Sequence, residues 1–240
     1  MVPTVIDRES AQSPWGLSFR RRRLGPEREL IDHFLNQNPI TIPRGCRLTI
    51  FQEPRLESGF PDLVAVVWNE AIARAWSPAR ADLSPADIRL THYLFHAGPC
   101  DDAQLRRLLL RNLTASIERL HSAGMIRSVG GRWSTRTRSR LFAARRIIAI
   151  EAKVGEWDAA LRQAFLNTWF ASESYVLVPR IPRTGRLLDE ANLLGIGVWA
   201  SAEKKARLPS SLRNPLPCSY ASWLFNEWAW RAELHPRGEP

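Results

Sequence analysis

Two apolar segments, far apart in the chain, constrain the fold most strongly. Residues 61–68 read Pro-Asp-Leu-Val-Ala-Val-Val-Trp, and residues 145–154 read Arg-Arg-Ile-Ile-Ala-Ile-Glu-Ala-Lys-Val. Because side chains alternate across a strand, Glu151 and Lys153 are expected on one face of a strand whose other face is apolar. Charged groups in a buried sheet are costly unless they are paired or bind an ion. The two segments therefore predict a sheet that carries a charged site, with Asp62 at the start of one of its strands.

The composition indicates a globular protein with an anionic partner. The chain has 240 residues, of which 45% are hydrophobic, and ten tryptophans, so it can build one large domain or a domain with a small module. Its formal net charge of +10 favours nucleic acid as the partner. Only three of its 34 basic residues are lysines, and one of them is Lys153. A guanidinium has a different shape and keeps its proton, so a lysine beside Glu151 favours a chemical site over a surface ion pair.

Several classes of protein are not indicated. The three cysteines, Cys46, Cys100 and Cys218, are far apart and form no Cys-x-x-Cys pair, so neither a disulfide framework nor a zinc knuckle is expected. No apolar run approaches the ~18 residues of a membrane span, and no signal sequence is evident, so we expect a cytoplasmic protein without a membrane partner. His92 and His96 have no third ligand at a suitable spacing, and ordinary packing is expected for them.

The pattern of helices, strands and turns divides the chain into five segments. They are an N-terminal arm (1–25), the first part of a core (26–77), an insert (78–138), the second part of the core (139–205) and a Trp-rich C-terminal segment that packs on the core (206–240). The arm ends in four arginines at 20–23, which either touch phosphates or are solvated. In the core, a helix is expected from Pro26 to Asn38, followed by a strand at 47–52.

The insert resembles a winged helix-turn-helix domain over residues 84–136. Helix starts at Ser84 and at Asp101, a third helix at 113–123 and a Gly130-Gly131 hairpin support this resemblance. In such domains the third helix and the wing contact DNA. The residues expected to do so here are Thr114, Ser116, Arg119, Arg127 and Arg132. Winged helices also dock proteins, and Glu118 on the third helix argues against a purely phosphate-binding surface, so protein docking stays open.

Without the insert, the predicted order is helix, strand, strand with Asp62, strand with Glu151 and Lys153, helix, strand, helix, strand. This order resembles the PD-(D/E)XK nuclease superfamily over about residues 26–200. The resemblance implies an α/β protein with a restriction-endonuclease-like core, that is, a mixed central sheet flanked by helices. The winged helix would lie between the Asp strand and the Glu-x-Lys strand, which accounts for their unusually long separation in sequence.

The resemblance also implies a metal-dependent nuclease, most simply a DNA endonuclease. Asp62, Glu151 and the Ala152 carbonyl would hold Mg²⁺, for which Mn²⁺ could substitute. Lys153 would act as a cation, because nearby carboxylates oppose the fall of roughly three pKa units that a general base needs. Two further residues belong to this expected site. Gln163 matches a catalytic helix glutamine of some branches, although Asn167 stands where their tyrosine follows, and Glu29 would be an additional carboxylate.

Alternatives to a nuclease remain open at the level of sequence. The chain could be a catalytically silent, nucleic-acid-binding regulator or an assembly subunit. DNA is favoured over RNA as the partner, and cutting of both strands would call for a homodimer. No ATPase motif is present, so partner proteins would supply any motor. The resemblance suggests a prokaryotic defence, mobile-element or repair system.

Overall fold

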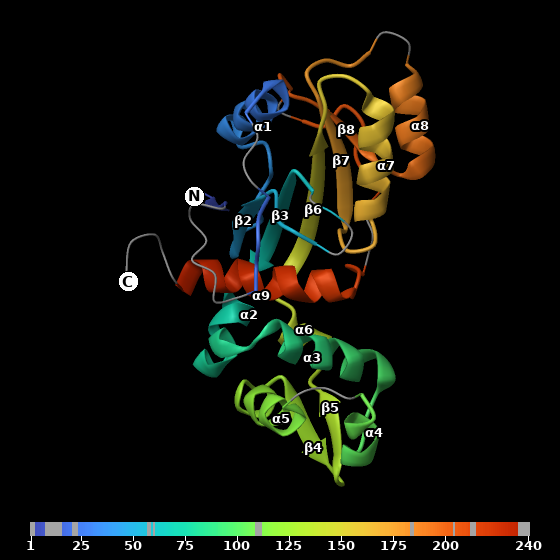
Figure 1. Ribbon diagram of the computed structural model, residues 1–240. Helices are drawn as coiled ribbons and strands as arrows, with labels where there is room; N and C mark the ends of the chain where they lie inside the picture. Colours follow the sequence, from blue (N-terminus) through green and yellow to red (C-terminus); the bar gives the residue numbers. More distant parts are fainter. Residues whose placement is uncertain are drawn as a thin grey trace.

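The architecture was obtained from a computed structural model (Figure 1). It describes residues 3–7, 16–20, 24–56, 59, 61–108, 112–182, 185–203, 205–211 and 215–234. Of the predicted arginine run 20–23, only Arg20 lies within the described residues.

A six-stranded mixed sheet forms the centre of the molecule, with strand order β1-β2-β3-β6-β7-β8. Its strands are β1 (Thr4–Ile6), β2 (Cys46–Gln52), β3 (Leu63–Asn69), β6 (Ala144–Ala152), β7 (Glu173–Val178) and β8 (Gly197–Ala200). The β2–β3 and β3–β6 pairs are antiparallel, whereas β1–β2, β6–β7 and β7–β8 are parallel. Strands β3 and β6 are therefore central, which agrees with their nearly continuous apolar sequences.

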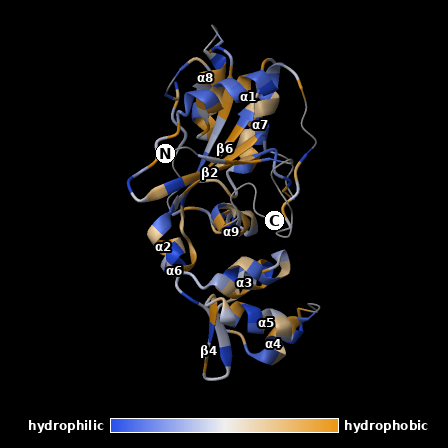
Figure 2. Cartoon of the chain, turned by 90° about the vertical axis from the view of Figure 1, so that its left-hand side faces the viewer, coloured by the Kyte–Doolittle hydropathy of each residue, from blue (hydrophilic) through white to orange (hydrophobic). Residues whose placement is uncertain are grey.

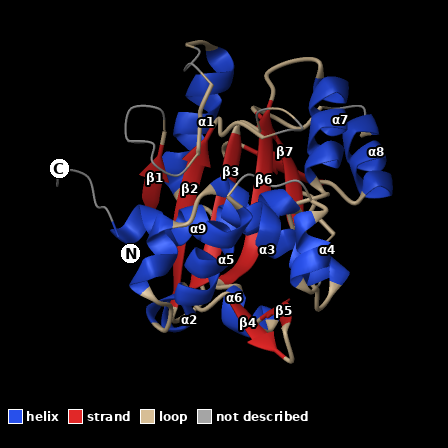
Figure 3. Cartoon of the chain, turned by 60° about the horizontal axis from the view of Figure 1, so that its bottom comes forward, coloured by secondary structure: helices blue, strands red, loops and turns tan. Residues whose placement is uncertain are grey.

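Helices cover both faces of the sheet. One face packs on α1 (Pro26–Gln37) through a cluster that joins Leu30 and Phe34 to β2, β3 and β6. The other face packs on α7 (Trp157–Asn167), α8 (Arg186–Leu194) and α9 (Tyr220–Leu234). Figure 3 shows α1 and α9 on opposite sides of the strands. The chain is thus α/β with a mixed central sheet flanked by helices, as the sequence predicted.

A small unit is inserted between β3 and β6. It contains α3 (Pro85–Ala97), α4 (Asp102–Arg106), α5 (Leu113–Ser122) and the hairpin of β4 (Ile126–Val129) and β5 (Arg132–Thr135). A β-bridge between Cys100 and Trp133 fixes the hairpin beside α4. The chain enters through α2 (Glu70–Arg74) and a 3₁₀ turn, η1 (Pro78–Asp82), and leaves through α6 (Arg138–Leu141). We call residues 85–135 the inserted unit.

Helix α9 lies between the sheet and the inserted unit (Figures 1 and 2). Trp223 and Trp228 are buried, and rings of Phe225 and Phe51 pack against each other where α9 meets β2. On its other side, Trp223 meets Phe95 of α3 edge to face. The tryptophans therefore pack in the core, as predicted, but α9 also joins the two parts of the molecule.

The predicted order of core elements is confirmed, and the differences lie at their ends. The arm contributes an edge strand, β1, which its short sequence did not signal. Strand β6 ends at Ala152, so Val154 is 48% exposed and not on the inner face as expected, because the chain has already left the sheet. Among the described helices, none has the length and apolar character needed to cross a membrane.

Candidate functional site

Asp62 and Glu151 meet where β3 begins and β6 ends. In the antiparallel register, Leu63 pairs with Ile150, so the residues just outside this pair, Asp62 and Glu151, stand opposite each other. The Ala152 amide donates a hydrogen bond to Asp62 Oδ2 over 2.8 Å, and the Asp62 amide donates to the Glu151 carboxylate. The backbone of each strand therefore holds the carboxylate of the other. Residues separated by the whole inserted unit are neighbours here, as the strand pattern predicted.

Asn167 fixes the Glu151 side chain from the end of α7. Its Nδ2 donates to Glu151 Oε1 over 2.6 Å, and both side chains are buried. Gln163, which the resemblance placed in the site, is exposed one helical turn earlier. Asn167 stands where some branches of the superfamily have a tyrosine, and in this chain it is the residue that bonds to Glu151.

Lys153 is paired with the first turn of α1. Its Nζ lies 2.6 Å from Glu27 Oε1, and Lys153 is held next to β7 by a backbone hydrogen bond to Leu177. The carboxylate that α1 contributes is thus Glu27, whereas the expected Glu29 is exposed. The sequence spacing indicates that Glu27 lies on the inward face of α1, because it precedes the buried Leu30, Ile31 and Phe34 by three, four and seven residues.

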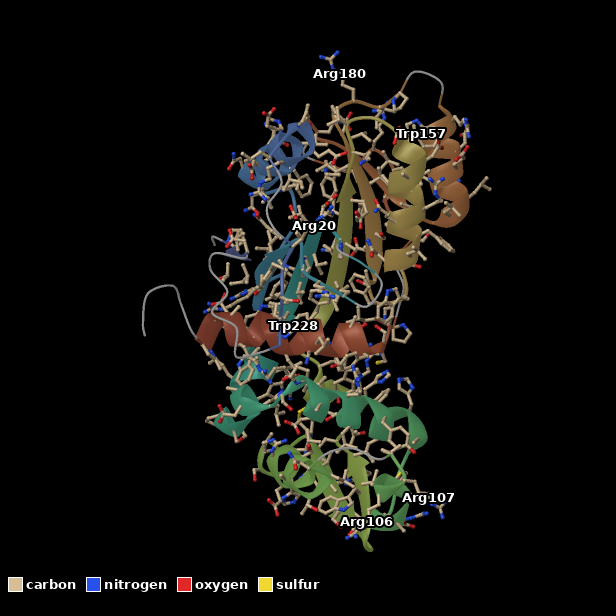
Figure 4. All side chains as sticks on the ribbon, in the orientation of Figure 1. Arg20, Arg106, Arg107, Trp157, Arg180 and Trp228 are labelled. Atoms are coloured by element: carbon tan, nitrogen blue, oxygen red, sulfur yellow. The ribbon has the colours of Figure 1, made fainter. Side chains whose placement is uncertain are left out.

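Glu53 brings a further carboxylate close to Asp62. Its amide donates to the Asp62 carbonyl over 2.9 Å, and its own carbonyl accepts from the Arg20 amide. Glu53 has a φ of 51°, which is uncommon for a residue other than glycine. Figure 4 shows Arg20 in front of the central strands. Glu53 could not be identified from the sequence, because a residue that follows β2 in a left-handed conformation belongs to no periodic pattern.

The electrostatics of the two central carboxylates favour a bound cation. Burial, with smaller contributions from Glu27 and Glu53, raises the pKa of Asp62 to about 6 against the opposing hydrogen bond from Ala152. Burial and the adjacent Asp62 raise the pKa of Glu151 to about 8, while the Asn167 bond opposes this. Two carboxylates in one dehydrated position resist simultaneous ionisation, and a divalent ion would offset that cost.

The donor set fits magnesium better than a softer metal. Asp62, Glu151 and the Ala152 carbonyl offer only oxygen, and Mg²⁺ is commonly held by one or two carboxylates with water and substrate phosphate completing its shell. Among the described residues, no group of three or more His, Cys, Asp or Glu side chains is placed to hold a metal. Water and substrate phosphate would complete the shell of an ion held by Asp62, Glu151 and the Ala152 carbonyl.

The raised pKa values predict an unusual pH dependence of stability. A carboxyl group whose pKa is higher in the folded state stabilises the fold below its unfolded pKa, near 4, and this contribution is lost as the pH rises through the folded value. Without divalent ions, these two groups should lower the free energy of unfolding between about pH 4 and pH 8. Asp62→Asn should therefore be more stable than wild type at pH 8 by about 3 kcal/mol, from a shift of roughly two pKa units at ~1.4 kcal/mol each.

Urea denaturation at several pH values in EDTA measures this difference. The gap between Asp62→Asn and wild type should widen as the pH rises, and Mg²⁺ should narrow it by stabilising only wild type. Glu118→Gln, which changes an exposed carboxylate on α5, is the matched control. A gap that stays constant with pH would contradict the raised pKa of Asp62.

The five residues predicted to contact DNA differ in their exposure within the inserted unit. Thr114, Arg127 and Arg132 are exposed. Ser116 is buried, and Arg119 donates from Nε and Nη2 to the fully buried Asp87 over 3.0 and 2.7 Å. Their expected positions in a groove are therefore not supported. Two exposed arginines that the sequence did not single out, Arg106 and Arg107, lie at the far end of the unit (Figure 4).

Arg119 is therefore expected to stabilise the inserted unit. Burial alone would raise the pKa of Asp87, but hydrogen bonds from Arg119, Ser84 and Ser116 lower it. Arg119→Ala would leave a buried carboxylate without its main partner, at a cost of about 1–3 kcal/mol. Thermal unfolding should show this loss, whereas Arg127→Ala should leave the melting temperature nearly unchanged. Equal melting temperatures for both variants would contradict a structural role for Arg119.

Comparisons with known proteins neither support nor exclude a family for this chain. No family model, no curated protein and no solved structure matches it.

Proposed function

We propose that the chain is a metal-dependent nuclease that hydrolyses phosphodiester bonds, with DNA as the substrate. The observation that carries this proposal is the meeting of Asp62 and Glu151 on two central antiparallel strands, with Lys153 two residues further on. The net charge of +10 supports a polyanionic substrate. Purely structural carboxylates would be expected to have arginine partners, as Glu173 has in Arg146 on the same sheet.

Each side chain has a distinct task in the proposed reaction. Asp62, Glu151 and the Ala152 carbonyl would hold Mg²⁺, which when bound supplies charge neutralisation and lowers the pKa of a water molecule. Asn167 keeps the Glu151 carboxylate in one orientation. Lys153 presents a positive charge to the phosphate as negative charge develops on it. Glu27 restricts where that ammonium lies.

The inserted unit would act as a winged helix that contributes DNA binding. Its three helices and hairpin have the element order of that domain, and the exposed Arg127 and Arg132 lie on the hairpin. The restriction-endonuclease-like identity of the core belongs to the same proposal and is supported by the order of its helices and strands.

Cleavage assays with plasmid and linear DNA in Mg²⁺ test the proposal. Wild type should cut, EDTA should prevent cutting, and Asp62→Asn and Glu151→Gln should lose at least about a hundredfold in rate. Both variants are nearly isosteric, so circular dichroism should show an intact fold. Glu190→Gln, which changes a partly exposed carboxylate on α8, should cut like wild type. Salt-dependent DNA binding without metal-dependent cutting would instead identify the silent regulator.

A further inference from the structure

Both connections between the core and the inserted unit are bonded to the same helix, α9. Where the chain enters, Arg80 of η1 forms a buried ion pair with Glu227, donating from Nε over 2.9 Å and from Nη2. Arg231 donates to the Arg80 carbonyl. All three side chains are at most 2% exposed. The entering connection is thus held by charged groups that have little access to water.

The leaving connection is held by Asn226, the residue that precedes Glu227 on α9. Asn226 Oδ1 accepts from the amides of Ala143 and Ala144 over 2.9 and 3.0 Å, and its Nδ2 donates to the Leu141 carbonyl. Arg80 Nη2 donates to the same Leu141 carbonyl. The two connections are therefore bonded to each other as well as to α9, which fixes the inserted unit as one body with the core.

We call the contacts of Arg80, Asn226, Glu227 and Arg231 the clamp. The clamp and the candidate active site lie at opposite ends of β6. Asn226 bonds at Ala144, where β6 begins, and the metal-binding carboxylate is Glu151, near its end. Seven residue steps at ~3.3 Å place them about 23 Å apart. Beyond the clamp, α9, α3 and the hairpin that carries Arg127 and Arg132 follow one another away from the strands (Figures 1 and 2). Two further separations of about 8–10 Å, from α9 to α3 and from α3 to the hairpin, bring the total to roughly 40 Å.

We infer that the enzyme cuts DNA at a fixed offset of about twelve base pairs from the place where the inserted unit binds. This value is the separation of roughly 40 Å divided by 3.4 Å per base pair. The inference rests on the proposed nuclease function and identifies its substrate as a duplex long enough to reach both sites. A flexibly tethered unit would allow many offsets, whereas the buried clamp allows one.

Phosphate neutralisation on a long duplex tests the offset directly. A short patch of uncharged methylphosphonate linkages is placed at its centre, and cuts are mapped along both strands in Mg²⁺ with DNA below saturation. Wild type should cut weakly at the patch, where the active site needs phosphate. It should also cut at least about fivefold more weakly in zones centred roughly twelve base pairs to either side, where the inserted unit would lie on the patch.

Variants assign the outer zones to the inserted unit. Arg127→Glu combined with Arg132→Glu should remove the outer zones and retain the central one. Arg186→Gln, which changes an exposed arginine of α8, should reproduce the wild-type map. A wild-type map with the central zone alone would overturn the fixed offset and leave the nuclease proposal standing. Absence of cutting on any duplex would overturn the nuclease proposal and the offset together.

Discussion

Replacing Glu227 by leucine is expected to lower the free energy of unfolding by about 3–5 kcal/mol, because it leaves buried guanidinium groups without their carboxylate. Glu227 is 1% exposed and accepts from both Nε and Nη2 of Arg80. It also offsets the charge of Arg231, whose pKa is lowered by burial and raised by Glu227. One carboxylate therefore serves two guanidinium groups at the connection between core and inserted unit.

Urea denaturation of a double-mutant cycle measures this contribution. Arg80→Met alone leaves Glu227 with less compensation, whereas Arg80→Met with Glu227→Leu removes both members of the pair and should cost less than the sum of the single changes. Glu190→Gln breaks the exposed pair with Arg186 and should cost less than about 1 kcal/mol. A Glu227→Leu variant as stable as this control would show that the clamp contributes little.

The sequence predicted the central sheet because its strongest signals are local. The apolar runs of β3 and β6, the helical stripe of α1 and the turn before Pro39 each reflect propensities within a few residues. The expectation that Asp62 lies beside Glu151 followed from the order of the strands together with the family resemblance. These features are determined by the sheet, so an insertion of a whole unit between the strands does not disturb them.

The clamp could not be predicted, because it depends on contacts between distant polar residues. Asn226 and Glu227 bind residues about 80 and 150 positions away. In the sequence they look like the polar positions of an amphipathic helix, and only the presence of a second body on the outer side of α9 makes them buried. The prediction that α9 packs on the core was correct for its tryptophans, but it did not include the contacts of its polar residues.

Two predictions that named a single residue on a helix were not confirmed, for a different reason. Ser116 precedes Leu120 by four residues and therefore lies on the buried side of α5, a signal that was present but outweighed by the expected DNA contact. On α1, the sequence suggested Glu29 as an additional carboxylate, whereas the residue that pairs with Lys153 is Glu27. In both cases the resemblance to a family suggested which helix to use, and helical phase was the better guide to which residue.

Lys153 is surrounded by carboxylates that stabilise its positive charge. The hydrogen bond from Lys153 to Glu27 raises the pKa of the ammonium, and nearby Asp62 adds to this against partial burial. A lysine that holds its proton at neutral pH cannot accept one from water, so its contribution must be positive charge. Removing an electrostatic contribution to the transition state typically costs about 10²–10³ in rate. Lys153→Gln should therefore cut DNA slower by this factor.

Lys153→Arg separates the two roles that a lysine could have here. Arginine retains the charge but cannot act as a base at any accessible pH. If Lys153 acts as a cation, Lys153→Arg should cut at least about tenfold faster than Lys153→Gln, and its pH–rate profile should have the wild-type shape between pH 6 and pH 9. Single-turnover cutting of a labelled duplex measures both quantities, and Lys205→Gln, which changes an exposed lysine, is the matched control.

The opposite outcome would assign the proton transfer to Lys153. Equal, severe losses in Lys153→Arg and Lys153→Gln, together with loss of the rising limb of the pH–rate profile, would mean that the reaction needs an unprotonated amine. Glu27→Gln then discriminates further, because removing this partner lowers the pKa of Lys153 and would accelerate a general base at neutral pH. If Lys153 acts as a cation, Glu27→Gln leaves its charge unchanged but removes the partner that positions it, so cutting should slow.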